Sequence, residues 1–315
     1  MIADLGLSLF LLALSLLSLI CLVLLSSSPS AHGPRGTQAN SSLFVYRFFP
    51  SDGSLVLLNI QGDAKTVMNP AFSRYHPRLN VVYTCTENCE DNGKIFAYKL
   101  GPDGSLEQLG EPVDAGGTST CYLTIDRAQK NMLAVNYWNA TLVVIPLDPE
   151  TGALAGAVKS VYDPKGGLEM VATVKTNGGA NHSFNDESTI AIRQKDPHSH
   201  ALVLDPYVGR VAYVPDLGKD LIREFFYDAN NGEIAMEINT LPSGLCTGKP
   251  DGPRYLEFHP KYNVAYVVNE LSSTVSERTN LLCQVEGSLI FDNGSHYFLV
   301  PSCVRLLFLK WIVSY

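Results

Sequence analysis

The sequence has little charge and no cluster of basic residues. Only 17% of its 315 residues are Asp, Glu, Lys or Arg, and the formal net charge is -8. Because nucleic-acid binding needs a basic surface, this acidic balance argues against DNA or RNA as partners. Sustained helical spacing of apolar residues is also missing between residues 40 and 275, which argues against long helices there. With 46% hydrophobic residues, the chain can nevertheless build a large core.

The cysteines and histidines show no paired spacing of the kind that binds zinc, so no metal site and no cofactor are predicted. Cys21 lies in the apolar N-terminal stretch, and the remaining six cysteines are Cys85, Cys89, Cys121, Cys246, Cys283 and Cys303. In an oxidising compartment a local Cys85–Cys89 bridge is one of many pairings, and the spacing alone does not select among them.

The chain begins with a strongly apolar stretch. Leu5 to Leu25 is almost continuously hydrophobic and is followed by small residues, which are typical of signal-peptidase cleavage after Ser28 or Ser30. The run is also long enough to span a bilayer, and Asp4 precedes it where a signal peptide usually has Lys or Arg. We expect residues 1–31 to be a signal peptide or, alternatively, an uncleaved anchor that would tie the protein to a membrane.

Four glycosylation sequons agree with secretion or a place in the secretory pathway. Their asparagines are Asn40, Asn139, Asn181 and Asn293. We therefore expect a secreted glycoprotein, or one held at the membrane by residues 5–25.

One strand–turn–strand pattern recurs along the chain. The turns are Asp52-Gly53-Ser54-Leu55, Asp103-Gly104-Ser105-Leu106, Thr151-Gly152-Ala153-Leu154 and Asn231-Gly232-Glu233-Ile234. Further β-rich blocks lie between them, and repeats of about 40 to 50 residues with several strands predict propeller blades. A β-sandwich with similar strands is the alternative. The longer interval before the last turn predicts an insertion, roughly Tyr162 to Gln194, that forms a loop over one face.

The stretch from Gly252 to Ser273 predicts two short strands joined by a tight turn. Arg254 lies near the start of the first strand and Glu270 directly after the second, so both flank the same end of the hairpin. A polar site can form at that end. His259, which precedes Pro260 in the turn, is expected to be structural.

Several motifs occur in the order expected for a known family. They are Arg193-Gln194-Lys195-Asp196-Pro197-His198-Ser199-His200, Tyr213-Val214-Pro215-Asp216-Leu217-Gly218, Gly252-Pro253-Arg254 and Asn269-Glu270-Leu271-Ser272-Ser273. With these motifs, residues 42 to 275 strongly resemble the seven-bladed lactonase propellers. That family includes propeller-type 6-phosphogluconolactonases and carboxy-cis,cis-muconate cyclases. The resemblance implies an all-β fold, a β-propeller of the seven-bladed lactonase type, incomplete here with about five recognisable blades.

The resemblance also implies a shallow polar site at one end of a central channel. By this match, His200, Arg254 and Glu270 are the catalytic candidates, and His198, Asn136, Tyr137 and Asn269 are substrate-binding candidates. An imidazole can move a proton to or from a lactone oxygen, and a guanidinium can hold a carboxylate or phosphate. The expected chemistry is hydrolysis of a small anionic lactone, or cyclisation of its open-chain acid. A non-catalytic binding propeller is the alternative.

The family pattern is expected to end after Val275. We therefore expect residues 32–278 to form a partial propeller and residues 279–315 a divergent tail without family resemblance. Our preferred explanation is an incomplete gene product that lacks about two blades and a further arginine of the anion site. The alternative is a shortened propeller whose tail supplies a closing strand.

Overall fold

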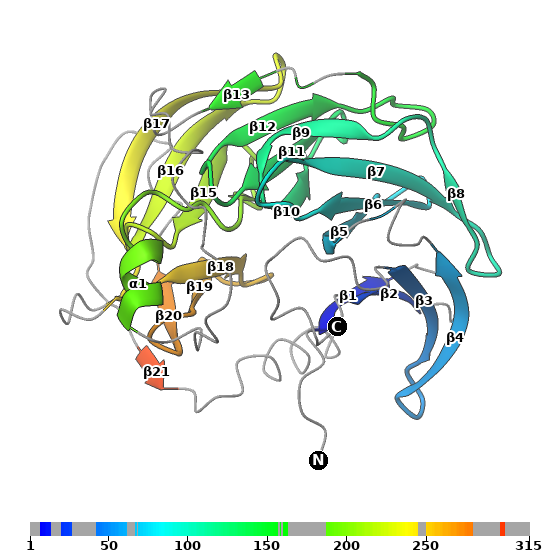
Figure 1. The fold of residues 1–315 in the computed structure, drawn as a ribbon, viewed down its shortest axis with the longest axis horizontal. Helices are drawn as coiled ribbons and strands as arrows, with labels where there is room; N and C mark the ends of the chain where they lie inside the picture. Colours follow the sequence, from blue (N-terminus) through cyan, green and yellow to red (C-terminus); the bar gives the residue numbers. More distant parts are fainter. Residues whose placement is uncertain are drawn as a thin grey trace. The chain divides into compact units, whose positions relative to one another are not determined.

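The computed structural model describes residues 7–13, 20–26, 42–61, 67, 69–156, 158, 160–162, 187–244, 250–279 and 297–299. The chain divides into two units, Met1–Asn181 and His182–Tyr315. Within the described ranges almost all regular structure is β-strand, and α1 (Glu187–Arg193) is the one helix (Figure 1). The strands form five antiparallel sheets, four of four strands and one of five.

The first unit contains three sheets, in which strands that are consecutive in sequence lie side by side. The first sheet is β1 (Leu7–Ala13), β2 (Ile20–Ser26), β3 (Ser42–Phe49) and β4 (Ser54–Gln61). The second is β5 (Pro70–Tyr75), β6 (Val81–Thr86), β7 (Asn92–Leu100) and β8 (Leu106–Gln108), with β9 (Val113–Thr118) also paired to β7. The third is β10 (Thr120–Ile125), β11 (Asn131–Asn136), β12 (Leu142–Pro146) and β13 (Ser160–Tyr162).

The second unit contains two more sheets with the same simple order. One is β14 (Val203–Leu204), β15 (Val211–Asp216), β16 (Leu221–Asp228) and β17 (Glu233–Pro242). The other is β18 (Pro253–Phe258), β19 (Val264–Asn269), β20 (Thr274–Thr279) and β21 (Tyr297–Leu299). The predicted hairpin between Gly252 and Ser273 is therefore confirmed, with Leu256 opposite Val267 in its register.

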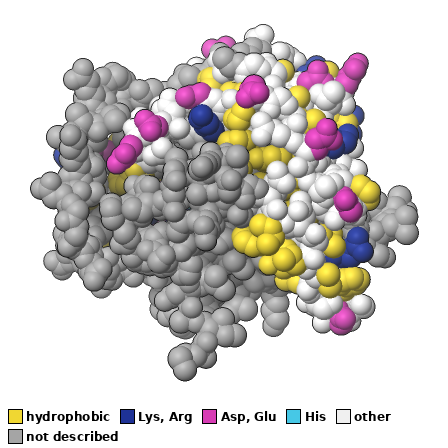
Figure 2. Space-filling model, turned by 45° about the vertical axis from the view of Figure 1, so that its right-hand side comes forward, with side chains coloured by type: hydrophobic (Ala, Val, Ile, Leu, Met, Phe, Trp, Pro, Cys, Tyr) yellow, Lys and Arg dark blue, Asp and Glu magenta, His cyan; other side chains and the backbone are white. Residues whose placement is uncertain are grey.

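The second strands of three of these sheets are the most deeply buried. Every residue of β6, β11 and β15 is buried, which is why these strands read as nearly continuous apolar runs rather than as alternating patterns. In the second unit, β15 contributes Tyr213 to a core that also contains Ile222, Leu256 and Val267 with neighbouring apolar side chains. The outer strands β4 and β17 are mostly exposed or half-buried. Figure 2 shows apolar patches among acidic side chains on one face.

The repeated turns join the third and fourth strands of four sheets. Each contains a glycine with positive φ, as the turn motif predicts, and these are Gly53, Gly104, Gly152 and Gly232, with φ between 62° and 87°. An aspartate one or four residues before each glycine accepts backbone N–H bonds from the turn, for example Ser105 N to Asp103 Oδ1 at 3.0 Å and Asn230 N to Asp228 Oδ1 at 2.9 Å. The glycine and this aspartate together satisfy the backbone angle and the exposed donors of the turn.

The end of the predicted propeller lies close to the end of a strand. β20 continues past Val275 to Thr279, and β21 pairs with it, placing Phe298 opposite Val275. The predicted boundary between propeller and tail stays a prediction, whereas one expectation about the insertion is wrong. The predicted loop insertion ends in helix α1, so its last residues are not a loop. The rest of that insertion, residues 163–186, lies outside the described residues.

The apolar N-terminal stretch contains two strands, and β2 pairs with β3 so that Ile20 lies opposite Phe48. A search of the described residues finds no helix long and apolar enough to cross a membrane. The expected signal peptide or anchor stays a prediction. Cys85 and Cys89 are separate thiols, so the bridge considered between them is not formed. Of the sequon asparagines, Asn139 is half-buried, and Asn40, Asn181 and Asn293 lie outside the described residues.

Candidate functional site

Four segments of the second unit bring polar side chains together. Helix α1 ends with Arg193, the following segment leads to His200, β18 carries Arg254, and Glu270 is the first residue after β19. Arg254 and Glu270 lie at the same end of their hairpin because Pro253 is opposite Asn269 in the register. The sequence prediction that these two side chains lie together is confirmed by the ion pair between them.

Glu270 lies between two guanidinium groups. Its Oε1 is 2.9 Å from Nη1 of Arg193, and its Oε2 accepts a hydrogen bond from Nη1 of Arg254. Burial raises the pKa of Glu270, but the charges of Arg254 and Arg193 outweigh this effect and hold that pKa well below its usual value. A carboxylate with both oxygens engaged and a low pKa is a weak base at neutral pH.

His200 is the buried member of the cluster, with 5% of its surface exposed. Burial and the charges of Arg254 and Arg193 hold the pKa of His200 well below its usual value, although Glu270 acts in the opposite direction. The imidazole is therefore neutral at physiological pH. Its ring meets Tyr255 edge-on, with centroids 5.5 Å apart, and Tyr255 also lies 5.4 Å from the Arg254 guanidinium carbon. The cluster thus combines a neutral base with two cations.

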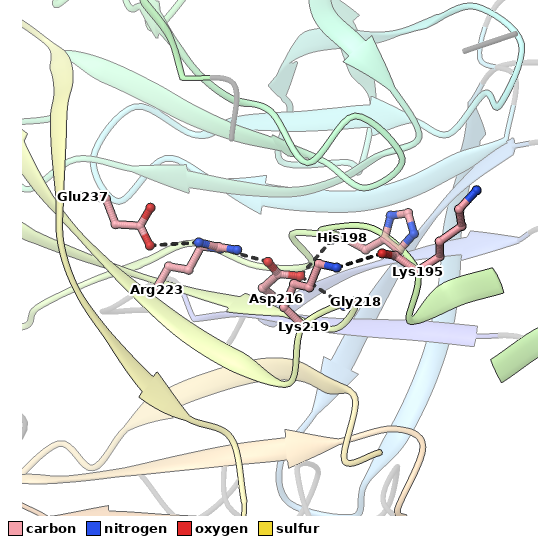
Figure 3. Close-up of polar contacts among 7 residues, drawn as sticks. All are labelled: Lys195, His198, Asp216, Gly218, Lys219, Arg223 and Glu237. Carbon is pink, nitrogen blue, oxygen red and sulfur yellow. Dashed lines mark hydrogen bonds and ion pairs between the residues drawn. The ribbon is translucent and has the colours of Figure 1, made fainter. Parts of the chain in front are cut away.

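The segment before His200 is anchored by Asp216, the last residue of β15 (Figure 3). This fully buried carboxylate accepts hydrogen bonds from His198 N at 2.8 Å and Gly218 N at 3.1 Å. Its other oxygen accepts Arg223 Nε at 2.8 Å. His200 N donates to Pro215 O at 3.0 Å, so the backbone on both sides of the anchor is fixed. Asp216 therefore orients the segment that carries the imidazole.

Arg223 extends this network toward the surface, and Gly218 allows the close backbone contact on which the network depends. The Arg223 Nη1 is 2.9 Å from Glu237 Oε1, so one guanidinium joins a buried and a half-buried carboxylate. At Gly218 an added Cβ would lie 1.8 Å from Asp196 O, which only glycine avoids. Here the β15–β16 turn and the segment leading to His200 come into close backbone contact.

A second carboxylate, Asp220, ties the β15–β16 turn to the start of β18. Its Oδ1 accepts the backbone N–H groups of Asp251 and Gly252 at 3.1 and 2.7 Å. Gly252 O in turn accepts Glu270 N at 2.7 Å. Gln194, the residue after Arg193, donates its amide to Leu217 O in the same turn. The backbones that carry Arg193, Arg254 and Glu270 are thus connected through one turn.

The other predicted site residues are placed differently. His198 is buried and contributes its backbone to the Asp216 anchor. Asn269 is fully buried, and its amide donates to Thr274 Oγ1 and Ser276 Oγ at 3.1 and 2.7 Å. His259 accepts backbone bonds from the β18–β19 turn, as expected of a structural residue.

Asn136 and Tyr137 lie in the first unit, at the end of β11. The Asn136 amide donates to Ala115 O and Thr141 Oγ1, both at 2.9 Å, and accepts Thr120 Oγ1 at 2.7 Å. Tyr137 is buried, with its ring edge-on to Trp138. Their predicted role in substrate binding stays a prediction, because the contacts of Asn136 are internal to its own unit.

Sequence reasoning missed Arg193, Tyr255 and the anchoring role of Asp216. Arg193 opens the Arg193–His200 motif and Tyr255 follows Gly252-Pro253-Arg254, so both were visible next to residues already chosen. The described residues contain no group of His, Cys, Asp and Glu arranged to hold a metal ion.

Comparison with known proteins identifies the family of the chain. Residues 35–280 match the family model "Lactonase, 7-bladed beta-propeller". Uncharacterized proteins of several Staphylococcus aureus strains are 28% identical to the chain over 205 residues, which is 65% of the chain and 51% of the relative. The chain thus spans about half the length of these curated relatives.

Solved structures show the same fold. A candidate 6-phosphogluconolactonase of Bacteroides fragilis superposes with a TM-score of 0.59 and 23% identity, over 84% of this chain and 65% of that one. The periplasmic gluconolactonase of Pseudomonas aeruginosa gives a TM-score of 0.59 and 22% identity, over 86% of this chain and 68% of that one. At these identities the likeness establishes the β-propeller fold.

Proposed function

Because the chain belongs to the lactonase family of seven-bladed β-propellers, we propose that it hydrolyses a small anionic lactone at the His200, Arg254 and Glu270 cluster. The observation that carries this proposal is a buried, neutral imidazole beside an arginine whose side chain is 37% exposed. The imidazole is suited to accept a proton, and the exposed guanidinium is suited to bind a carboxylate or phosphate.

The chemistry follows from the protonation states. A water molecule attacks the lactone carbonyl carbon while His200 accepts one of its protons. The tetrahedral intermediate collapses by breaking the ring C–O bond, and His200 returns the proton to the departing ring oxygen. The product is a hydroxy acid and His200 is neutral again. Glu270, held as a low-pKa carboxylate, fixes the guanidinium groups rather than taking the proton.

The protonation state of His200 also bears on the choice between the two candidate reactions, hydrolysis and cyclisation. Forming a lactone from a muconate-type acid requires a proton donor to carbon, and a histidine with a lowered pKa is a poor source of that proton near pH 7. Hydrolysis requires a base, which the neutral imidazole supplies. The site therefore favours hydrolysis over cyclisation.

The test is hydrolysis of a phosphorylated sugar lactone, measured above the spontaneous rate by release of acid. We expect His200→Gln to lower kcat/KM by roughly 10²–10⁴-fold, the usual contribution of a general base. His259→Asn is the matched control, because His259 directly follows the end of β18 that lies opposite to Arg254, and it accepts a backbone hydrogen bond in the turn there. A folded wild-type protein that does not accelerate hydrolysis of any anionic lactone would refute the proposal and leave the binding propeller as the explanation.

A further inference from the structure

Helix α1 contributes a cation that the proposed reaction has not used. Arg193 is the last residue of the helix, and its side chain is 11% exposed, compared with 37% for Arg254. Both guanidinium groups contact the same carboxylate, on different oxygens. Arg193 therefore lies below the exposed surface, and Glu270 separates its charge from the more accessible Arg254.

This arrangement controls how Glu270 meets Arg254. Arginine and carboxylate groups often pair through two parallel hydrogen bonds, which occupies one whole edge of the guanidinium. Here Arg193 engages Oε1, so Arg254 reaches the carboxylate through Nη1 and Oε2. With one oxygen held by Arg193, Glu270 cannot turn to form the two-bond pair with Arg254.

We propose that Arg193 is a positioning residue that sets the preference for anionic substrates, by holding Glu270 so that the Arg254 guanidinium keeps donors available for a substrate carboxylate or phosphate. This inference rests on the proposed lactone site, but its first test is binding and needs no turnover. Without Arg193, Glu270 pairs with Arg254 through both oxygens and competes with the substrate anion.

Electrostatics gives a second, independent readout. Among the described residues, the groups that shift the pKa of His200 or contact its ring are Arg193 from α1, Arg254 and Tyr255 from β18, and Glu270 after β19. Burial lowers the pKa of His200 most, Arg254 lowers it further, Glu270 raises it, and Arg193 lowers it. Removing the Arg193 charge therefore raises the pKa of His200. The acid limb of the pH–rate profile then shifts to higher pH.

The experiment compares Arg193→Gln, Arg193→Lys and Glu270→Gln on the full chain, after each variant is shown to melt cooperatively. Binding of inorganic phosphate is measured by calorimetry, and KM is measured for a phosphorylated sugar lactone and for its neutral counterpart. For Arg193→Gln we expect phosphate affinity and the anionic KM to worsen roughly ten- to hundredfold, the range for one charge-assisted hydrogen bond. KM for the neutral lactone should stay within about twofold of the wild-type value.

The controls separate positioning from general damage. Arg193→Lys keeps a charge near Oε1 and should recover part of the phosphate affinity, and it carries the test if the glutamine variant does not fold. In the Glu270→Gln background, adding Arg193→Gln should change phosphate affinity little, because the two residues act through one contact. Equal losses for the anionic and neutral lactones, or unchanged phosphate binding, would overturn the inference. Anion-selective binding without turnover would overturn only the proposed hydrolysis, whereas turnover whose anion preference is the same in the wild-type protein and in Arg193→Gln would overturn only the role of Arg193.

Discussion

Replacing Asp216 by alanine tests the anchor of the His200 segment. The buried carboxylate accepts bonds from His198 N, Gly218 N and Arg223 Nε at 2.8, 3.1 and 2.8 Å. Its loss leaves two buried N–H groups without their acceptor, and Arg223 with only its half-buried partner Glu237. Removing one member of a buried ion pair lowers the free energy of unfolding by about 3–5 kcal/mol. Because the Arg223 side chain is 14% exposed, we expect a loss of about 3 kcal/mol, at the lower end of that range.

The assay is urea unfolding followed by circular dichroism, with two comparison variants. Asp216→Asn keeps an acceptor oxygen but removes the charge, so its loss should be roughly 1–2 kcal/mol. Glu237→Gln removes the more exposed carboxylate from the same guanidinium and should cost about 0–1 kcal/mol. The reasoning is refuted if Asp216→Ala and Glu237→Gln destabilise the protein equally. In that case burial and the backbone bonds would not be what anchors the segment.

Three further outcomes follow from individual contacts. The turn carboxylates have lowered pKa values because they accept hydrogen bonds within the turns, chiefly from backbone N–H groups. The stability that they contribute is therefore fully present above their unfolded pKa near 3.8, and it is lost as pH falls through the lower folded pKa. They are Asp52, Asp103, Asp148 and Asp228. The urea midpoint should therefore fall between pH 4 and 2 as these carboxylates are protonated, and a midpoint insensitive to pH in that range would contradict this account. A separate, earlier fall is expected below the unfolded histidine pKa of 6.5, because burial lowers the folded-state pKa values of His76 and His200. Gly218→Ala should lower the melting temperature and reduce lactone turnover, since its Cβ would lie 1.8 Å from Asp196 O; unchanged values for both would show that the turn relaxes freely. Iodoacetamide at pH 8 should label Cys89 in the native protein but not Cys85, whose pKa is raised by complete burial, and mass spectrometry of native and urea-unfolded samples checks the difference.

The fold was predictable wherever local residues decide the backbone. The turns around Gly104 and Gly232 could be read from sequence because a positive φ and an aspartate acceptor are local requirements. The pairing of Arg254 with Glu270 followed from hairpin register for the same reason. Strand β21 was not predictable, since a three-residue strand is defined by its partner β20 rather than by its own pattern.

The site was only partly predictable because its geometry depends on contacts between distant segments. Asp216 accepts a hydrogen bond from the backbone N–H of His198, 18 residues earlier, and an isolated β-bridge pairs Ser199 with Asp216. Arg193 was visible in the sequence, but its pairing with Glu270 was not, because Arg193 lies in a segment expected to be loop and Glu270 is far along the chain. Residue types indicate which chemistry such a site can perform, while the packing of its segments decides which residue accepts the proton and which residues hold the others in position.

The last residue of the second strand is polar in all five sheets, and in four of them its hydrogen bonds differ from one sheet to the next. Thr86 accepts a backbone N–H of its own hairpin, and Asn136 and Asn269 each donate to a threonine five residues ahead. Asp216, at the same position, turns its carboxylate toward another segment and an arginine. A modular architecture of this kind allows specialisation by single substitution. One copy of the module can acquire a new task while the others preserve the frame, so a change at Asp216 should alter chemistry locally and leave the neighbouring modules intact.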